Sequence, residues 1–151
     1  MTVRFRKRRT AVATAAVIAL AAFAAPAAQA DNTSPAGKWR IYHPVTSEPY
    51  MIVEIEEKNG DLSGHIIGLA DGPADAICWS CIGENKNKPL AGMEFIKDGK
   101  WNGQGWTAVM MRPATGMVAP AFFQLEPGGE AIHMTTGRGP LQVDQRWQRI
   151  D

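Results

Sequence analysis

Between residues 38 and 149, short stretches of alternating apolar and polar residues are separated by turn-forming residues. In residues 50–57 the apolar side chains of Met51, Val53 and Ile55 would share one face of an extended chain, with two glutamates on the other. This period of two is typical of strands with one buried face. It predicts eight strands: Lys38–His43, Tyr50–Glu57, Leu62–Leu69, Met93–Lys97, Trp106–Arg112, Met117–Leu125, Ala131–Thr136 and Leu141–Arg149.

Most of these strands are joined by short turns, which favours antiparallel neighbours. Asn59-Gly60-Asp61 is typical of a tight hairpin, because glycine adopts positive φ without steric cost. Evenly spaced antiparallel strands in one small domain favour a barrel or a sandwich. An eight-stranded barrel is either filled by side chains or wide enough for one small ligand. We therefore predict an all-β fold, with a single small antiparallel β-barrel of about eight strands over residues 37–151.

The first 30 residues have the three parts of a cleavable signal peptide, followed by a polar lead-in over residues 31–36. A basic start, an apolar run over residues 11–25 and the small-x-small sequence Ala28-Gln29-Ala30 occur in that order. The run is shorter than the roughly 20 strongly apolar residues that span a membrane. We expect cleavage before Asp31, a periplasmic or secreted protein, and no transmembrane anchor after cleavage. The pair Arg8-Arg9 leaves Sec and twin-arginine export as alternatives.

Removing the predicted signal peptide changes the charge of the chain. The full sequence has 16 basic and 15 acidic residues, and five of the basic ones lie in residues 1–30. The mature part keeps 11 basic against 15 acidic residues, a formal net charge of −4. A weakly acidic domain without a Lys/Arg cluster is a poor candidate for binding nucleic acid or an anionic membrane.

Cys78 and Cys81 are the only cysteines, in a segment of about twenty residues, 70–89, that has no clean strand pattern. Export would place them where disulfides persist, which favours a structural disulfide. Two alternatives stay open. A redox-active Cys-x-x-Cys pair would need a helix N-terminus, which the sequence does not predict here. A metal site would need His43, His65 or His133 to complete the ligand set.

The sequence assigns no catalytic, cofactor-binding or metal-binding residue. Glu54 and Glu56 would share one face of a strand, which could suit paired carboxylates, but an exposed strand face is the ordinary use of such residues. No Gly-x-Ser-x-Gly sequence locates a nucleophile. The C-terminal strands are instead rich in methionine and aromatic residues, which either fill the core or line an apolar pocket. The candidate pocket residues are Trp106, Met110, Met117, Phe122 and Met134.

The two ends of the predicted domain resemble those of lipocalin-like (calycin) barrels. Gly37-Lys38-Trp39 opens the domain and Trp147-Gln148-Arg149 closes it. The resemblance implies that Arg149 packs across Trp39 and closes one end of the barrel. A cation–π contact of this kind contributes about 0.5–2 kcal/mol.

A closer resemblance covers residues 37–150. After Gly-x-Trp come an Ile-Val-Glu-Ile strand, a Leu-x-Gly-x-Ile return strand, Cys-x-x-Cys, the sequence Lys88–Met93 and the turn Pro113–Gly116. In this order they resemble the DUF2147 family of small exported bacterial proteins, whose biochemical role is undefined and whose fold is lipocalin-like. The second half departs from the family: Arg112 stands where the family has aspartate, and Met117 where it has lysine. A function that depends on those polar positions would be altered or lost here.

Three hypotheses for the function follow. The first is a non-catalytic barrel that binds a small, partly apolar ligand or a cell-envelope component, and an apolar cavity would favour it. The second is an enzyme acting on an envelope component, which requires Glu54, Glu56, His65 or the cysteine pair to converge on a cleft. The third is a closed barrel that acts through its outer surface or through residues 70–89, and a filled interior would favour it.

Overall fold

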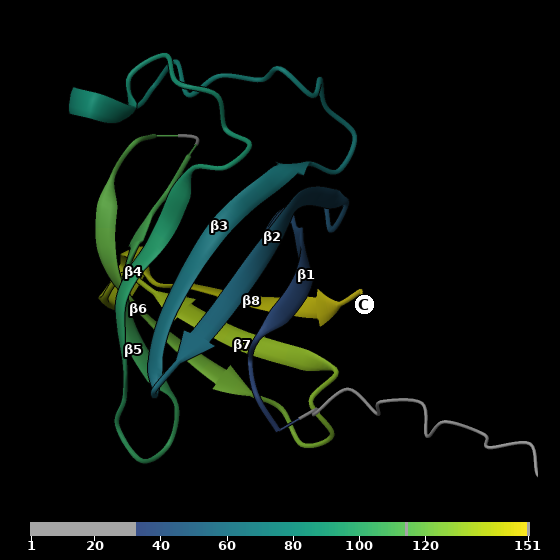
Figure 1. Cartoon of the computed structure of the whole chain (residues 1–151), viewed down its shortest axis with the longest axis vertical. Coiled ribbons are helices and arrows are strands. Elements are labelled where there is room, and N and C mark those ends of the chain that lie inside the picture. The colour runs from purple at the N-terminus through teal and green to yellow at the C-terminus, as the bar shows by residue number, and fades with distance from the viewer. Residues whose placement is uncertain (1–32, 114, 151) are drawn as a thin grey trace, which may run out of the picture.

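The alternating stretches form the eight expected strands, and these make an all-β barrel (Figure 1). The computed structural model describes residues 33–113 and 115–150. The predicted signal peptide and the cleavage site before Asp31 lie outside the described residues. The strands are β1 (Gly37–Tyr42), β2 (Pro49–Lys58), β3 (Asp61–Leu69), β4 (Glu94–Trp101), β5 (Trp106–Met111), β6 (Val118–Leu125), β7 (Ala131–Thr136) and β8 (Val143–Arg149). The predicted fold class is confirmed.

The sheet closes on itself, because β1 pairs with β8 as well as with β2. All neighbours are antiparallel and, apart from β1 and β8, follow one another in sequence, so each connection is a loop at one end of the barrel or the other. In the closing pair, Trp39 lies opposite Arg149 and Arg40 opposite Gln148. Closure leaves none of the eight described strands with a free edge to pair with another chain.

Alternation along each strand decides which side chains fill the barrel. On β2, Met51, Val53 and Ile55 are buried while Glu54 and Glu56 are exposed. The same alternation on the other strands gathers one apolar core inside the barrel. It includes two fully buried tryptophans, Trp39 and Trp147. The hydrophobic pattern that predicted the strands therefore also sets their register.

Arg149 seals one end of the barrel. Its guanidinium lies over the Trp39 ring, 4.3 Å from the ring centroid. It also donates three hydrogen bonds of 2.7 Å to backbone carbonyls, from Nε to Gly129, from Nη1 to Ala36 and from Nη2 to Ser34. The side chain thus ties the segment before β1 and the β6–β7 turn to the last strand.

The loops at the opposite end are longer. The β3–β4 loop, residues 70–93, lies across this end at the top of Figure 1, and the β1–β2 and β5–β6 loops reach the same end. Among the described residues, no helix is long and apolar enough to cross a membrane. The helical content there is two 3-10 turns, η1 (Gly83–Asn85) and η2 (Gly139–Leu141). The two ends of the barrel therefore differ, one sealed by side chains and one surrounded by loops.

Replacing Arg149 should destabilise the barrel far more than replacing another arginine of the same strand. Arg149→Gln loses three charge-assisted hydrogen bonds and the contact with Trp39, so we expect urea unfolding to show a loss of about 3 kcal/mol. Arg146→Gln is the matched control, because Arg146 pairs with Glu126 on the exposed outer face. Its unfolding midpoint should barely move. Equal losses in the two variants would contradict the role given to Arg149.

Candidate functional site

A cavity of about 240 Å³ opens at the loop end of the barrel. Its inner wall is apolar and includes Phe95, Met110, Met134 and Trp147. Trp147 stacks on Phe95, with ring centroids 6.1 Å apart, and meets Phe123 edge-on at 5.4 Å. Phe95 and Trp147 line the cavity, whereas Phe123 and Trp39 belong to the core but do not line it. The interior is therefore filled toward the Arg149 end and hollow toward the loops.

The volume limits what the cavity can hold. A dry apolar cavity of about 150 Å³ accepts benzene, and drug-sized ligands occupy sites of about 300–1,000 Å³. The cavity here lies between these values. It has room for one ring with a short substituent, or for an acyl chain of similar bulk.

The polar groups of the cavity come from five different strands or the loops that follow them. They are His43 after β1, Tyr50 on β2, Thr136 on β7, Gln145 on β8 and Arg112 after β5. None of the described lining residues is acidic. The lining thus combines an apolar interior with a neutral to positive rim.

Two of these polar groups already have partners. The Thr136 hydroxyl donates to the Pro120 carbonyl at 2.9 Å. The Gln145 side-chain oxygen accepts from the indole nitrogen of Trp147 at 3.3 Å, and its amide nitrogen donates to the Tyr42 carbonyl at 3.4 Å. These contacts hold the side chains of Thr136 and Gln145 in place.

The His43 ring is oriented by its own turn. Its Nδ1 accepts hydrogen bonds from the backbone N–H groups of Val45 and Thr46, each at 3.3 Å. The neutral imidazole then carries its proton on Nε2, which is free to donate. The Tyr50 ring packs edge-on against it, with centroids 6.3 Å apart. Burial raises the pKa of the Tyr50 hydroxyl above its ordinary 10.0, which keeps it protonated and able to donate.

The structure brings together only part of the pocket expected from the sequence. Met110 and Met134 line the cavity, whereas Trp106, Met117 and Phe122 do not. Trp106 begins β5 at the opposite end, where its ring lies 4.5 Å from that of Trp101. Met117 precedes β6 and is 63% exposed, so it is a loop residue. Phe122 lies between two inward residues of β6 and therefore points to the outer face.

The cysteine pair forms the expected disulfide. The Cα atoms of Cys78 and Cys81 are 5.4 Å apart, and both residues are 1% exposed. The bond consumes both thiols, and no α-helix follows it that would activate one of them. The described residues contain no group of three or more His, Cys, Asp or Glu side chains placed to hold a metal ion. The disulfide is a structural feature of the β3–β4 loop.

The disulfide loop packs against the β5–β6 loop that carries Arg112. The Ser80 hydroxyl donates to the Pro113 carbonyl at 2.9 Å, and the Cys81 sulfur lies 3.8 Å from that of Met111. Gly116 has a φ of +66°, and a Cβ atom there would lie 2.8 Å from the Cys81 Cα. The close fit at this glycine lets the two loops meet and shapes one side of the cavity mouth.

The carboxylates considered for catalysis lie on the outer face, away from the cavity. Glu54 and Glu56 are exposed on β2. His65 on β3 lies between Glu54 and Glu94 in the cross-strand register. None of these residues lines the cavity, and the disulfide is separate from them. The groups named in the enzyme hypothesis do not converge on a cleft.

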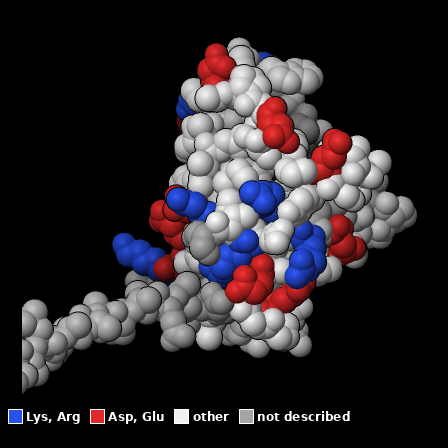
Figure 2. Space-filling model, turned by 90° about the vertical axis from the view of Figure 1, so that its right-hand side faces the viewer, with Lys and Arg blue, Asp and Glu red and all other residues white. Residues whose placement is uncertain are grey.

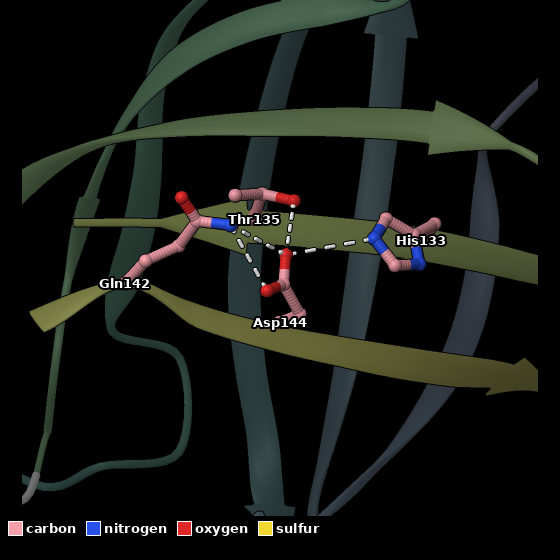
Figure 3. A network of polar contacts seen from close by, with 4 residues as sticks. All are labelled: His133, Thr135, Gln142 and Asp144. Carbon is pink, nitrogen blue, oxygen red and sulfur yellow. Dashed lines mark hydrogen bonds and ion pairs between the residues drawn. The ribbon is translucent and has the colours of Figure 1, made fainter. Parts of the chain in front are cut away.

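Asp144 is the centre of a polar network on the outside of β7 and β8 (Figure 3). Its carboxylate accepts from the Thr135 hydroxyl at 2.7 Å and from the Gln142 amide at 3.0 Å, with His133 Nε2 at 3.6 Å. The hydrogen bond from Thr135, followed by that from Gln142, lowers the pKa of Asp144 below its ordinary 3.8. All four residues come from β7, β8 and the loop between them, so the network supports strand pairing rather than a cavity.

Charges of both signs are mixed on the surface. On the face shown in Figure 2, basic and acidic side chains lie side by side, without a broad patch of one sign. Exposed pairs of this kind include Lys97 with Glu94 at 3.0 Å and Lys100 with Asp61 at 2.5 Å. This face offers no basic stripe that would follow a nucleic-acid backbone.

Comparisons with known proteins agree on the family and the fold. The model of the family described as "Uncharacterized protein conserved in bacteria (DUF2147)" matches residues 37–149. No curated protein matches the chain. Among solved structures, protein HP1028 from Helicobacter pylori, described as belonging to the lipocalin family, matches with a TM-score of 0.67. It is 15% identical, and the match covers 78% of this chain and 84% of that one. This likeness shows a lipocalin-like fold.

The disulfide should matter for the loop but not for formation of the barrel. A Cys78→Ala/Cys81→Ala double variant should stay folded and lose less than the about 3 kcal/mol associated with a 15-residue disulfide ring, because this ring is much shorter. Urea unfolding of the variant and of the reduced wild type should agree. An unfolded double variant would contradict a purely local role.

Asp144 should stabilise the fold only above acidic pH. Its folded-state pKa is lowered, so its contribution is present at neutral pH and is lost as the pH falls through that pKa. Asp144→Asn should therefore be slightly less stable than wild type at pH 7 and equal to it near pH 2, as followed by thermal unfolding. Asp75→Asn, in the exposed β3–β4 loop, is the control. A difference that persists at pH 2 would count against the network.

Proposed function

The chain belongs to the DUF2147 family, and we propose that this member is an exported protein that binds a small, partly apolar ligand without catalysis. The observation that supports the proposal is the cavity at the loop end of the barrel. Its apolar wall would remove a ligand's apolar part from water, at about 25 cal/mol per Å² of buried surface. The polar mouth would fix the ligand's orientation.

Binding alone is proposed because of where the titratable groups lie. Among the described residues that line the cavity there is no carboxylate and no thiol. The imidazole of His43 is tied by Nδ1 to its own turn, and burial raises the pKa of Tyr50 and keeps its hydroxyl protonated, so neither group is set up as a base. A general acid–base mechanism needs a titratable pair within hydrogen-bond reach of a reacting atom. The carboxylates that could form such a pair are on the outside of the barrel.

Export is proposed from the sequence of the first 30 residues, and the disulfide supports it, because disulfides persist outside the reducing cytoplasm. Fractionation of cells expressing the full chain should place the protein in the periplasm or the medium. Amino-terminal sequencing of that protein should begin at Asp31. Recovery of the uncleaved chain from the membrane fraction would contradict this part of the proposal.

A bulky residue at the mouth of the cavity should abolish binding. Val143 begins β8, is only partly buried and lines the cavity, so a tryptophan there would block the entrance while the core stays packed. The probes are 3-phenylpropanoate and 3-phenylpropanol, each a ring with a short substituent. We expect wild type to bind at least one of them in isothermal titration calorimetry, and Val143→Trp to lose at least about ten-fold in affinity, which corresponds to 1.4 kcal/mol.

Val109→Trp is the matched control for this experiment. Val109 lies on the outer face of β5, is 38% exposed and does not line the cavity. Its variant should bind as wild type does. If neither probe binds at millimolar concentration, or if the two variants bind equally well, the proposed ligand site is wrong.

A further inference from the structure

We propose that the cavity selects a small amphipathic anion, with the anionic group held by Arg112 at the mouth and the apolar part against the aromatic wall. The inference rests on the proposed function and specifies its ligand class. A carboxylate attached to one ring or to a short acyl chain fits both halves of the site. The wall is formed by Phe95, Met134 and Trp147.

The lining of the cavity carries a positive charge and no negative one among the described residues. Arg112 is the one permanently charged residue among the described lining residues, and no acidic residue accompanies it. An arginine beside an apolar surface keeps its charge at all physiological pH values. The free energy of binding at such a site is therefore more favourable for an anion than for a neutral ligand, and it is least favourable for a cation.

Arg112 has side-chain hydrogen-bond donors that the described residues do not engage. Its backbone N–H donates to the Met117 carbonyl at 2.8 Å, which holds the β5–β6 loop in place. The guanidinium itself has no hydrogen bond or ion pair with the described residues, although it is half-buried. The arginines of β8 differ in this respect, since Arg149 donates to three carbonyls and Arg146 to Glu126. Arg112 alone combines open donors with a place in the cavity wall.

Two further hydrogen-bond donors lie at the mouth beside Arg112 and would also favour an anion. His43 Nε2 and the Tyr50 hydroxyl line the same mouth, and both can donate to an oxygen atom. A planar carboxylate can accept two parallel hydrogen bonds from a guanidinium and further ones from such neighbours. The Thr136 hydroxyl donates to the Pro120 carbonyl, and the side-chain oxygen of Gln145 accepts from the indole N–H of Trp147. The mouth thus supplies donors where an anion needs them.

The cavity volume sets the size of the apolar part. At about 240 Å³, the cavity is larger than one that accepts benzene and smaller than a site for a drug-sized molecule. A carboxylate at Arg112 would leave the remaining space to a single ring or a short chain. Ligands with two long chains would not fit.

The test compares three probes with the same apolar part: 3-phenylpropanoate, 3-phenylpropanol and 3-phenylpropylamine. Titration calorimetry of wild type should show the carboxylate bound about 10- to 100-fold more tightly than the alcohol, as expected for a charge-assisted hydrogen bond. The amine should bind most weakly. Arg112→Gln should lower the affinity for the carboxylate to that of the alcohol and leave the affinity for the alcohol unchanged.

Arg138→Gln is the matched control. Arg138 is an exposed arginine in the β7–β8 loop at the same end of the barrel, and it does not line the cavity. Its variant should bind all three probes as wild type does, and circular dichroism should show both variants folded. If the alcohol binds as tightly as the carboxylate, or if Arg138→Gln has the same effect as Arg112→Gln, the proposed anion site is wrong while ligand binding stands. If no probe binds, the proposed function itself fails.

Discussion

Closure of the sheet between the first and last strands is the constraint on which the rest of the structure depends. A strand has one row of backbone groups on each side, and only closure pairs both rows of every strand within one small domain. The β1–β8 contact achieves this with few residues in register, Trp39 opposite Arg149 and Arg40 opposite Gln148. Arg149 adds what backbone pairing cannot, because its guanidinium joins the segment before β1 to the β6–β7 turn.

Sealing one end makes a cavity possible at the other. The Arg149 end is filled around Trp39, which does not line the cavity, and the Phe95–Trp147–Phe123 group belongs to the same apolar core. The cavity lies at the loop end of the barrel, and the disulfide and the close contact at Gly116 hold the loops around it in place. The apolar wall of the cavity belongs to the same core that stabilises the barrel, so residues 37–149 supply both the core and the cavity.

The sequence predicted the strands well because a period of two is a local property that every strand shows. All eight expected strands form, and the disulfide and the family are confirmed. The lining of the cavity was predicted less well. A residue lines it only if it lies at the loop end of its strand and on the inner face, and the sequence pattern does not show which end of the barrel is hollow. Phe122 and Phe123 differ by one position, yet only Phe123 points inward. The sequence marked Arg112 only as a departure from the family, and the fold shows that Arg112 and Trp147 line the same cavity.

The most direct test of a ligand site inside the barrel uses methionine as a reporter. Met51, Met110, Met111 and Met134 line the cavity, whereas Met93 is buried elsewhere in the core. In protein labelled with ¹³C at the methionine methyl groups, titration with 3-phenylpropanoate should shift the resonances of the four lining methionines and leave that of Met93 in place. Shifts that follow a single-site binding curve would support binding in the cavity. Unchanged lining methionines, or shifts at Met93 as large as theirs, would contradict it.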